Sequence, residues 1–71
     1  MGNGRYAVII KDKIPIYDEE GRFLFRPPLG SVYPKLEEDT KNIKILVAVT
    51  DQDGRAFMKS AVVSKEAAIS K

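Results

Sequence analysis

Paired carboxylates are the residues of this chain that come closest to a catalytic arrangement. Asp51 and Asp53 stand two residues apart, as do Asp18 and Glu20. Two carboxylates whose environments separate their pKa values can act as general acid and general base, as in glycoside hydrolysis. Each pair, however, directly precedes a glycine, and acidic residues before glycine typically form turns. We therefore assign both pairs to turns and predict no catalytic residue.

The other side chains that usually carry chemistry are missing from this sequence. It contains no histidine and no cysteine. Without imidazole its serines have no ordinary base to activate them, and without thiols it has neither disulfides nor thiolate metal sites. Asp51-Gln52-Asp53-Gly54 resembles the start of a calcium loop, but Ser60 stands where such a loop needs a glutamate. We predict no enzymatic activity, no metal and no cofactor.

Length and charge limit the chain to a small globular domain. Its 71 residues carry 12 basic and 10 acidic side chains, with both signs mixed along the sequence. One domain spanning 1–71 is expected. The longest apolar run, Ile45–Val49, is far shorter than the roughly 20 residues that cross a bilayer. The N-terminus lacks the pattern of a signal peptide. We expect no membrane insertion, and a cell-envelope location only if the domain belongs to a wall-associated protein.

One hairpin is the clearest structural element of the sequence. Ile45–Val49 is apolar and mostly β-branched, as in a buried strand. Asp51–Gly54 then has the composition of a tight turn, and Arg55–Lys59 returns as the partner strand.

The rest of the chain reads as short extended pieces separated by turns. Arg5–Lys11 alternates weakly, and Ile14–Tyr17 contains a proline that disfavours helix. Lys35–Asn42 is highly charged and is expected to form an exposed loop. Ser64–Ala68 has a serine N-cap followed by good helix formers, which predicts a short helical turn or tail. The pattern as a whole predicts an all-β barrel.

The aromatic residues supply the candidate ligand site. We expect Phe57 and one of Phe23 and Phe25 to lie in the core. Tyr17 and Tyr33 are better suited to the surface, because tyrosine can present an apolar ring while its hydroxyl stays hydrated. Together with nearby prolines they would line a shallow groove for an extended peptide. The alternative is that both tyrosines sit at the barrel edge without a ligand.

Three short motifs give the chain its resemblance to a known family. Asp53–Ser60, Ile14–Asp18 and Leu29–Val32 are similar to segments of bacterial Src-homology-3 domains. The resemblance implies a five-stranded, strongly bent barrel, with a turn at Ser60-Ala61 and a final strand at Val62-Val63. The sequence departs from the family where Gly-Trp-Val often follows the arginine. It has Ala-Phe-Met there, and it contains no tryptophan.

The resemblance implies a non-catalytic binding module that recognises peptide or cell-wall components. On this interpretation Tyr17, Tyr33 and Phe57 contact the ligand.

Two other functions stay open at the level of sequence. Lys44, Arg55 and Lys59 could form a modest basic face that binds nucleic acid. The C-terminal half is somewhat similar to small archaeal chromatin proteins, although those are richer in lysine. A purely structural role, in which an edge strand pairs with another protein, is the remaining alternative.

Overall fold

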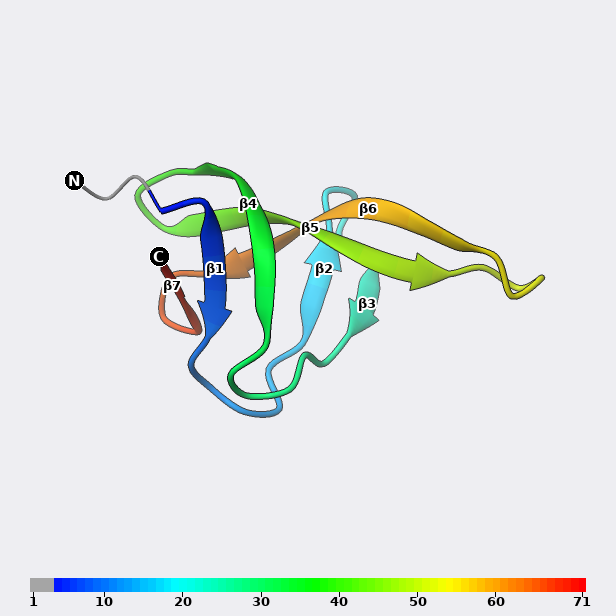
Figure 1. The fold of residues 1–71 in the computed structure, drawn as a ribbon, viewed down its shortest axis with the longest axis horizontal. Helices are drawn as coiled ribbons and strands as arrows, with labels where there is room; N and C mark the ends of the chain where they lie inside the picture. The colour runs from blue at the N-terminus through cyan, green and yellow to red at the C-terminus, as the bar shows by residue number, and fades with distance from the viewer. Residues whose placement is uncertain (1–3) are drawn as a thin grey trace.

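Seven strands and no helix form from residues 4–71, the part of the chain that the computed structural model describes (Figure 1). The strands are β1 (Tyr6–Ile9), β2 (Ile16–Asp18), β3 (Phe23–Phe25), β4 (Val32–Glu38), β5 (Asn42–Thr50), β6 (Ala56–Ser64) and β7 (Ala68–Ser70). The all-β prediction is confirmed. Residues 1–3, considered above for a signal peptide, lie outside the described part.

The strands form one antiparallel sheet in the order β3-β2-β6-β5-β4-β1-β7. β3 and β7, at the two ends of this order, do not pair with each other, so the sheet is open. The predicted five-stranded, partly open barrel is not confirmed, because the sheet has seven strands and is not closed into a barrel. β4 connects the two halves of the sheet, because Val32–Pro34 pair with β1 while the part from Lys35 onward pairs with β5.

The β5–β6 hairpin is confirmed and is longer than predicted. Its nine register pairs run from Asn42↔Ser64 to Thr50↔Ala56. The turn expected at Ser60-Ala61 is wrong, because β6 continues through both residues. Ala61 and Val63 alternate into the core on this strand, and this burial favours a continuous extended backbone.

The C-terminal segment is a strand instead of the predicted helical turn. A tight turn, closed by the Ala67 amide donating to the Ser64 carbonyl oxygen at 2.9 Å, leads into β7. β7 then pairs with β1, with Ala68 opposite Ile9. Ala68 is completely buried, and this tertiary pairing outweighs a local helix preference of only a few residues.

The charged segment Lys35–Asn42 is also more regular than predicted. β4 extends to Glu38, and only the turn around Asp39 separates it from β5. Pro34 is tolerated within β4 because pairing with β5 starts only at Lys35.

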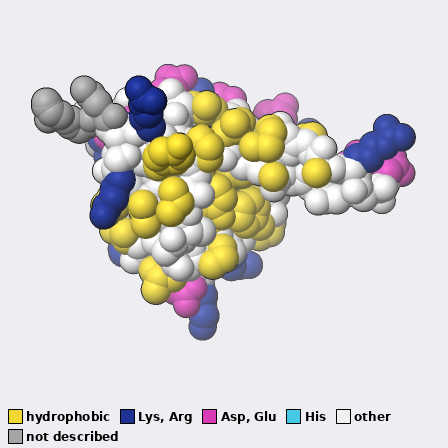
Figure 2. Space-filling view, in the orientation of Figure 1, with side chains coloured by type: hydrophobic (Ala, Val, Ile, Leu, Met, Phe, Trp, Pro, Cys, Tyr) yellow, Lys and Arg dark blue, Asp and Glu magenta, His cyan; other side chains and the backbone are white. Residues whose placement is uncertain are grey.

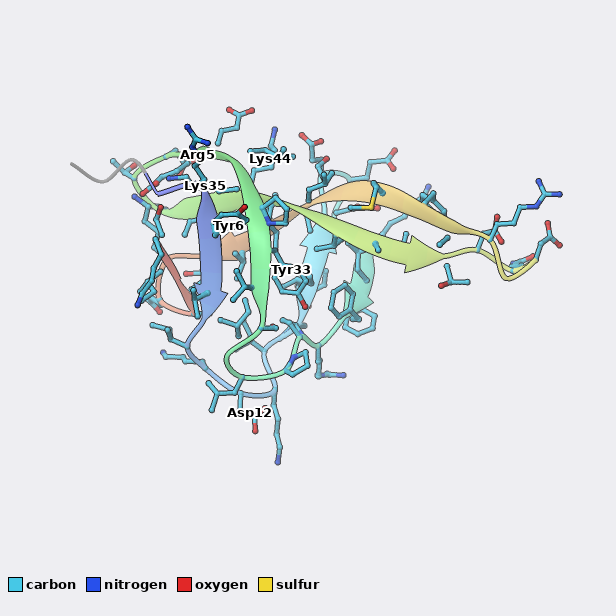
Figure 3. All side chains as sticks on the ribbon, viewed as in Figure 1. Arg5, Tyr6, Asp12, Tyr33, Lys35 and Lys44 are labelled. Carbon is cyan, nitrogen blue, oxygen red and sulfur yellow. The ribbon has the colours of Figure 1, made fainter. Side chains whose placement is uncertain are left out.

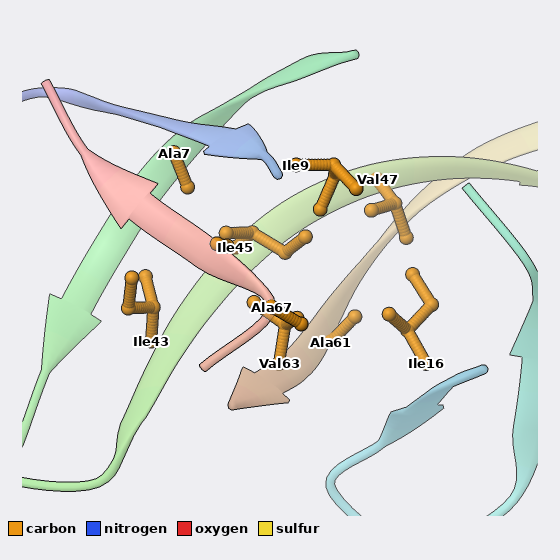
Figure 4. Packing of buried hydrophobic residues seen from close by; sticks show 10 residues of the cluster. Ala7, Ile9, Ile16, Ile43, Ile45, Val47, Ala61, Val63 and Ala67 are labelled. Atoms are coloured by element: carbon orange, nitrogen blue, oxygen red, sulfur yellow. The ribbon is translucent and has the colours of Figure 1, made fainter. Parts of the chain in front are cut away.

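The core consists of aliphatic side chains (Figure 4). They are Ala7, Ile9, Ile16, Ile43, Ile45, Val47, Ala61, Val63, Ala67 and Ala68. They come from strands at both ends of the sheet order, so the sheet must bend around them. Phe25 packs against this cluster, as expected for one of Phe23 and Phe25. Phe57 is 44% exposed, so its prediction as a core residue is wrong.

Two of the hairpin turns have the same sequence pattern, Asp-x-Glu/Asp-Gly-Arg, and the same hydrogen bonds. In Asp18–Arg22 and Asp51–Arg55, the first carboxylate accepts the amides two and four residues later at 2.8–2.9 Å. The glycines, Gly21 and Gly54, adopt φ angles of 83° and 82°. This left-handed conformation favours glycine and matches a three-residue hairpin loop.

Truncating the core should destabilise the fold strongly. Ile45→Ala is expected to lower the free energy of unfolding by about 2–5 kcal/mol, because Ile45 is fully buried. Urea denaturation monitored by circular dichroism measures the change. The control is Leu29→Ala, at a 58% exposed position, which should change the free energy by no more than about 0.5 kcal/mol. Equal effects of the two substitutions would contradict this assignment of the core.

Candidate functional site

A groove of about 420 Å³ lies between the β1–β2 connection, the end of β6 and the turn before β7. Its apolar lining comes from Ile14, Pro15, Tyr17, Val62, Val63 and Ala67. Tyr17 and Val62 are register partners in β2 and β6, so both side chains project to the same side. Ile16, between Pro15 and Tyr17, points into the core and fixes this segment to the sheet.

Polar groups stand around this apolar floor. Lys11, Asn42, Ser64 and Glu66 also line the groove. They offer an ammonium, an amide, a hydroxyl and a carboxylate, which together can donate to and accept from the backbone of a bound chain. The volume and the mainly apolar lining match those of ordinary ligand pockets.

Tyr17 begins a short aromatic row that continues away from the groove. Its ring meets Phe23 edge to face, with centroids 6.2 Å apart and an interplanar angle of 72°. The Arg26 guanidinium lies 5.4 Å from the centroid of the Phe23 ring, in cation–π contact. Tyr17 and Phe23 are 43% and 52% exposed, so the row presents aromatic surface to solvent.

The other two aromatic residues predicted for the site lie elsewhere. Tyr33 pairs with the buried Ala7 and packs against the core beside Phe25, with ring centroids 6.3 Å apart (Figure 3). Phe57 lies near the far end of the long hairpin, opposite Val49. The structure therefore does not bring Tyr17, Tyr33 and Phe57 together.

Sequence reasoning missed the partners of Tyr17. Ile14 and Pro15 immediately precede the strand that carries Tyr17. Side chains alternate between the two faces of an extended segment, so Pro15 and Tyr17 lie on the same side and Ile16 on the other. This alternation could have been used to predict Pro15 as a neighbour of Tyr17. Val62 and Ala67 could be found only from the pairing of β2 with β6 and from the course of the chain after β6.

The three basic residues proposed for nucleic-acid binding do not form one patch. Lys44 is paired with Glu19 at 2.8 Å and with Glu37 at 3.1 Å (Figure 3). These pairs raise the pKa of Lys44, with the hydrogen bond to Glu19 as the largest cause. Lys59 lies on the opposite face of the hairpin from Lys44. Its ammonium group is 3.3 Å from the carboxylate of Asp18.

Arg55 lies at the hairpin tip, directly after the turn. Two of the three cations thus already have carboxylate partners.

Asp18 is a buried structural carboxylate. Its Oδ1 accepts the two turn amides, and its Oδ2 lies near Lys59 in an ion pair that lacks good hydrogen-bond geometry. The pKa of Asp18 is lowered, chiefly by the backbone hydrogen bond from Arg22, in spite of desolvation. These contacts give Asp18 a structural role, consistent with the assignment of its segment to a turn.

A second ionic cluster joins β4 to the segments beside it. Glu38 is 2.7 Å from the ammonium groups of both Lys35 and Lys65. Lys35 also donates to the Ser70 hydroxyl at 2.6 Å. The hydrogen bond from Lys35, followed by that from Lys65, lowers the pKa of Glu38 from 4.5 to about 2.

Residues 4–71 contain neither a metal-binding cluster nor a membrane-spanning helix. No group of three or more acidic side chains in this part could hold a metal ion. None of its segments is an apolar helix of the length needed to span a bilayer.

Comparison with known proteins identifies the family. The family described as SH3 domain of SH3b2 type matches residues 1–40, which is more than half of the chain. The chain belongs to this SH3 family. The match confirms the predicted family. It includes the motifs Ile14–Asp18 and Leu29–Val32, and with them Pro15 and Tyr17 of the groove, whereas Asp53–Ser60 lies outside the matched residues. SH3 domains are in general non-catalytic binding modules that bind peptides or other proteins. A search of curated proteins gave no match.

The ion pairs of Glu38 should make the stability of the SH3 domain depend on pH in the acidic range. A carboxylate with a lowered pKa contributes stability above its ordinary pKa, here 4.5, and this contribution is lost as the pH falls towards about 2. Glu38→Gln should therefore be less stable than wild type above pH 4.5, and the difference should shrink on acidification. Urea midpoints from about pH 6 to about pH 2 measure it.

Glu66→Gln is the matched control, because Glu66 forms no ion pair within the described residues. Its difference from wild type should stay nearly constant over the same range. A constant difference for Glu38→Gln as well would show that the Lys35–Glu38–Lys65 cluster contributes nothing to stability.

Proposed function

We propose that this SH3 domain is a non-catalytic docking module that binds an extended peptide, such as the peptide part of a cell-wall fragment, in the groove beside Tyr17. The observation that carries the proposal is the combination of an apolar floor with a half-exposed tyrosine ring in a single groove. Tyrosine provides rigid contact area at a low cost in side-chain entropy, and for this reason it is common at binding surfaces.

The groove suits an extended chain for two reasons. Ile14, Pro15 and Val62 offer aliphatic surface to alternate side chains of a peptide. Asn42 and Ser64, which also line the groove, can hydrogen-bond the peptide backbone. Only Lys11 and Glu66 contribute charge to the lining, one of each sign, so the groove favours a ligand with little net charge.

The charge distribution supports a peptide over a nucleic acid. Lys44 and Lys59 are already paired with carboxylates, and phosphate contacts would require these pairs to break. Phosphate-dominated binding also weakens steeply with salt, whereas binding in an apolar groove responds little. Salt dependence therefore distinguishes the two functions.

The test is a titration of the ¹⁵N-labelled domain with muropeptides released from bacterial cell walls, followed by amide NMR. Shifts are expected around Tyr17, Val62 and Ala67, with little change when the salt concentration is raised. Tyr17→Ala should weaken binding at least about tenfold, because Tyr17 lines the groove and its side chain is partly exposed to a ligand.

Tyr6→Ala serves as the control, since Tyr6 is 51% exposed and does not line the groove. It should bind like wild type. An unchanged spectrum at about millimolar muropeptide, or equal binding by Tyr17→Ala, would overturn the proposal. A response to oligonucleotide that disappears with salt would favour the nucleic-acid alternative.

A further inference from the structure

The distal half of the β5–β6 hairpin has no strand beside it. β4 pairs with β5 only as far as Ile45, and β2 pairs with β6 only at Ala61 and Val62. Figure 1 shows the two strands continuing past the rest of the sheet, and Figure 2 shows the same part of the molecule standing out from the body. Beyond these points the hairpin is a two-stranded ribbon with two open edges, and an open edge presents unpaired backbone groups.

Hydrogen bonds at the two ends of the hairpin show which backbone groups point outward. At one end the Lys65 amide donates to the Lys41 carbonyl oxygen at 2.9 Å. At the other end the Asp51 amide donates to the Arg55 carbonyl oxygen at 3.0 Å. Hydrogen-bonded and non-hydrogen-bonded pairs alternate along an antiparallel ladder, and the register between these ends is continuous. Both ends therefore assign the odd-numbered residues of β5 to the hydrogen-bonded pairs with β6.

The even-numbered residues Ala48 and Thr50 consequently direct their amide and carbonyl groups away from β6. No strand pairs with them on that side, and no backbone hydrogen bond from outside the hairpin reaches them within residues 4–71. Both residues are exposed. This side of β5 thus offers two donors and two acceptors to solvent. We call residues 46–50, on the side away from β6, the β5 edge.

The β5 edge lacks the features with which proteins usually prevent strand pairing. Residues 46–50 contain no charge, proline or glycine, and no register shift interrupts their pairing with β6. Lysine, proline and bulges are the usual protections of an exposed edge. The opposite edge, on β6, differs because it carries Lys59 and because Glu19 accepts a hydrogen bond from Ser60 beside it.

We propose that the β5 edge pairs with the β5 edge of a second copy of the chain, in an antiparallel arrangement about a two-fold axis at Val49. This register places Ala48 opposite Thr50 of the second copy, and Thr50 opposite Ala48 of the second copy. Each of these pairs exchanges two hydrogen bonds, so four bonds use every open group of Ala48 and Thr50 in both copies. A two-fold axis makes the contact self-complementary.

The side chains fit this register. Val49 and Phe57 are cross-strand partners, so in the dimer the two Val49 side chains meet and a Phe57 ring flanks each of them. Phe57 is 44% exposed in the single chain, and the dimer extends the apolar row to which it belongs. Asp51 comes opposite Val47 of the second copy, whose partner on β6 is Lys59. The charges nearest to the contact are therefore of opposite sign.

The small size of the contact sets the strength of the dimer. Four hydrogen bonds and one apolar row amount to less than a standard interface, which takes roughly 800 Å² from each partner, and such small contacts are transient. The expected dissociation constant is between about 0.1 mM and about 1 mM.

Dimerisation leaves the peptide groove free, because no residue of 46–50 or 56–58 lines it. This inference therefore does not rest on the proposed function. Tyr17→Ala, which should impair ligand binding, should dimerise like wild type, so failure of one proposal is distinguishable from failure of the other.

Sedimentation equilibrium of the wild-type chain tests the dimer. The weight-average mass should rise from 7.9 kDa towards twice that value as the concentration increases from about 10 μM to about 1 mM. Ala48→Pro should weaken association at least about tenfold, because it removes two of the four hydrogen bonds and its ring obstructs the second strand.

The matched control is Met58→Pro. Met58 is the cross-strand partner of Ala48, and its amide points outward from the opposite edge of the same hairpin. Proline is tolerated where an amide faces solvent, so both variants should keep the circular dichroism spectrum of wild type. Met58→Pro should associate like wild type.

Amide hydrogen exchange of the wild-type chain, measured by NMR, provides a second test that needs no substitution. Exchange at Ala48 and Thr50 should slow about two- to threefold between about 50 μM and about 1 mM, whereas the Val49 amide, which is directed at Phe57, should be protected equally at both concentrations.

Three outcomes would overturn the proposal. A mass that stays at 7.9 kDa throughout would do so and would leave the β5 edge to a strand of a different protein. Association that Ala48→Pro leaves intact, or exchange that slows with concentration only at other residues, would contradict the pairing of the two β5 edges.

Discussion

Burial of ten aliphatic side chains is the constraint on which the rest of the structure depends. Most of these residues come from strands towards both ends of an open sheet. They are shielded from water only if the sheet bends until its two halves face each other. β4 makes the bend possible by pairing with β1 along its first part and with β5 along its second. The bend in turn determines which side chains face outward, and thus where the groove beside Tyr17 lies.

The sequence predicted the fold best where local pattern and tertiary burial agree. In the Ile45–Val49 strand Ile45 and Val47 are buried and Val49 is partly buried. The turn after this strand also has strong local chemistry, so the hairpin was predicted correctly. Prediction failed where the two disagree. Residues 64–68 have a local preference for helix, yet Ala68 is needed in the core beside Ile9. Phe57 has the spacing of a core residue on a hairpin that extends past the body of the protein, where nothing remains to cover it.

The candidate site could be predicted only in part for a related reason. Tyr17 was recognised from its residue type, but its groove is completed by Val62 and Ala67, more than forty residues away in sequence. Lys44 and Lys59 looked available in the sequence because their partners, Glu19 and Asp18, belong to a turn that becomes their neighbour only after β2 pairs with β6. Charge along a sequence is therefore a poor guide to charge that a ligand can use.

The two turns with the pattern Asp-x-Glu/Asp-Gly-Arg share their internal hydrogen bonds but differ in their surroundings. The Asp18 turn is tied to β6 through Lys59, and Glu19 in the same turn also reaches Ser60. The Asp51 turn is held by hydrogen bonds among its own backbone groups and the Asp51 carboxylate. It lies at the exposed end of the long hairpin, in a molecule whose longest extent is 41 Å. Because loop-closure cost grows by only about 0.6 kcal/mol per doubling of length, this tip is a natural position for a grafted epitope or an inserted reporter. Such an insert would lie away from the core and the groove (Figure 1).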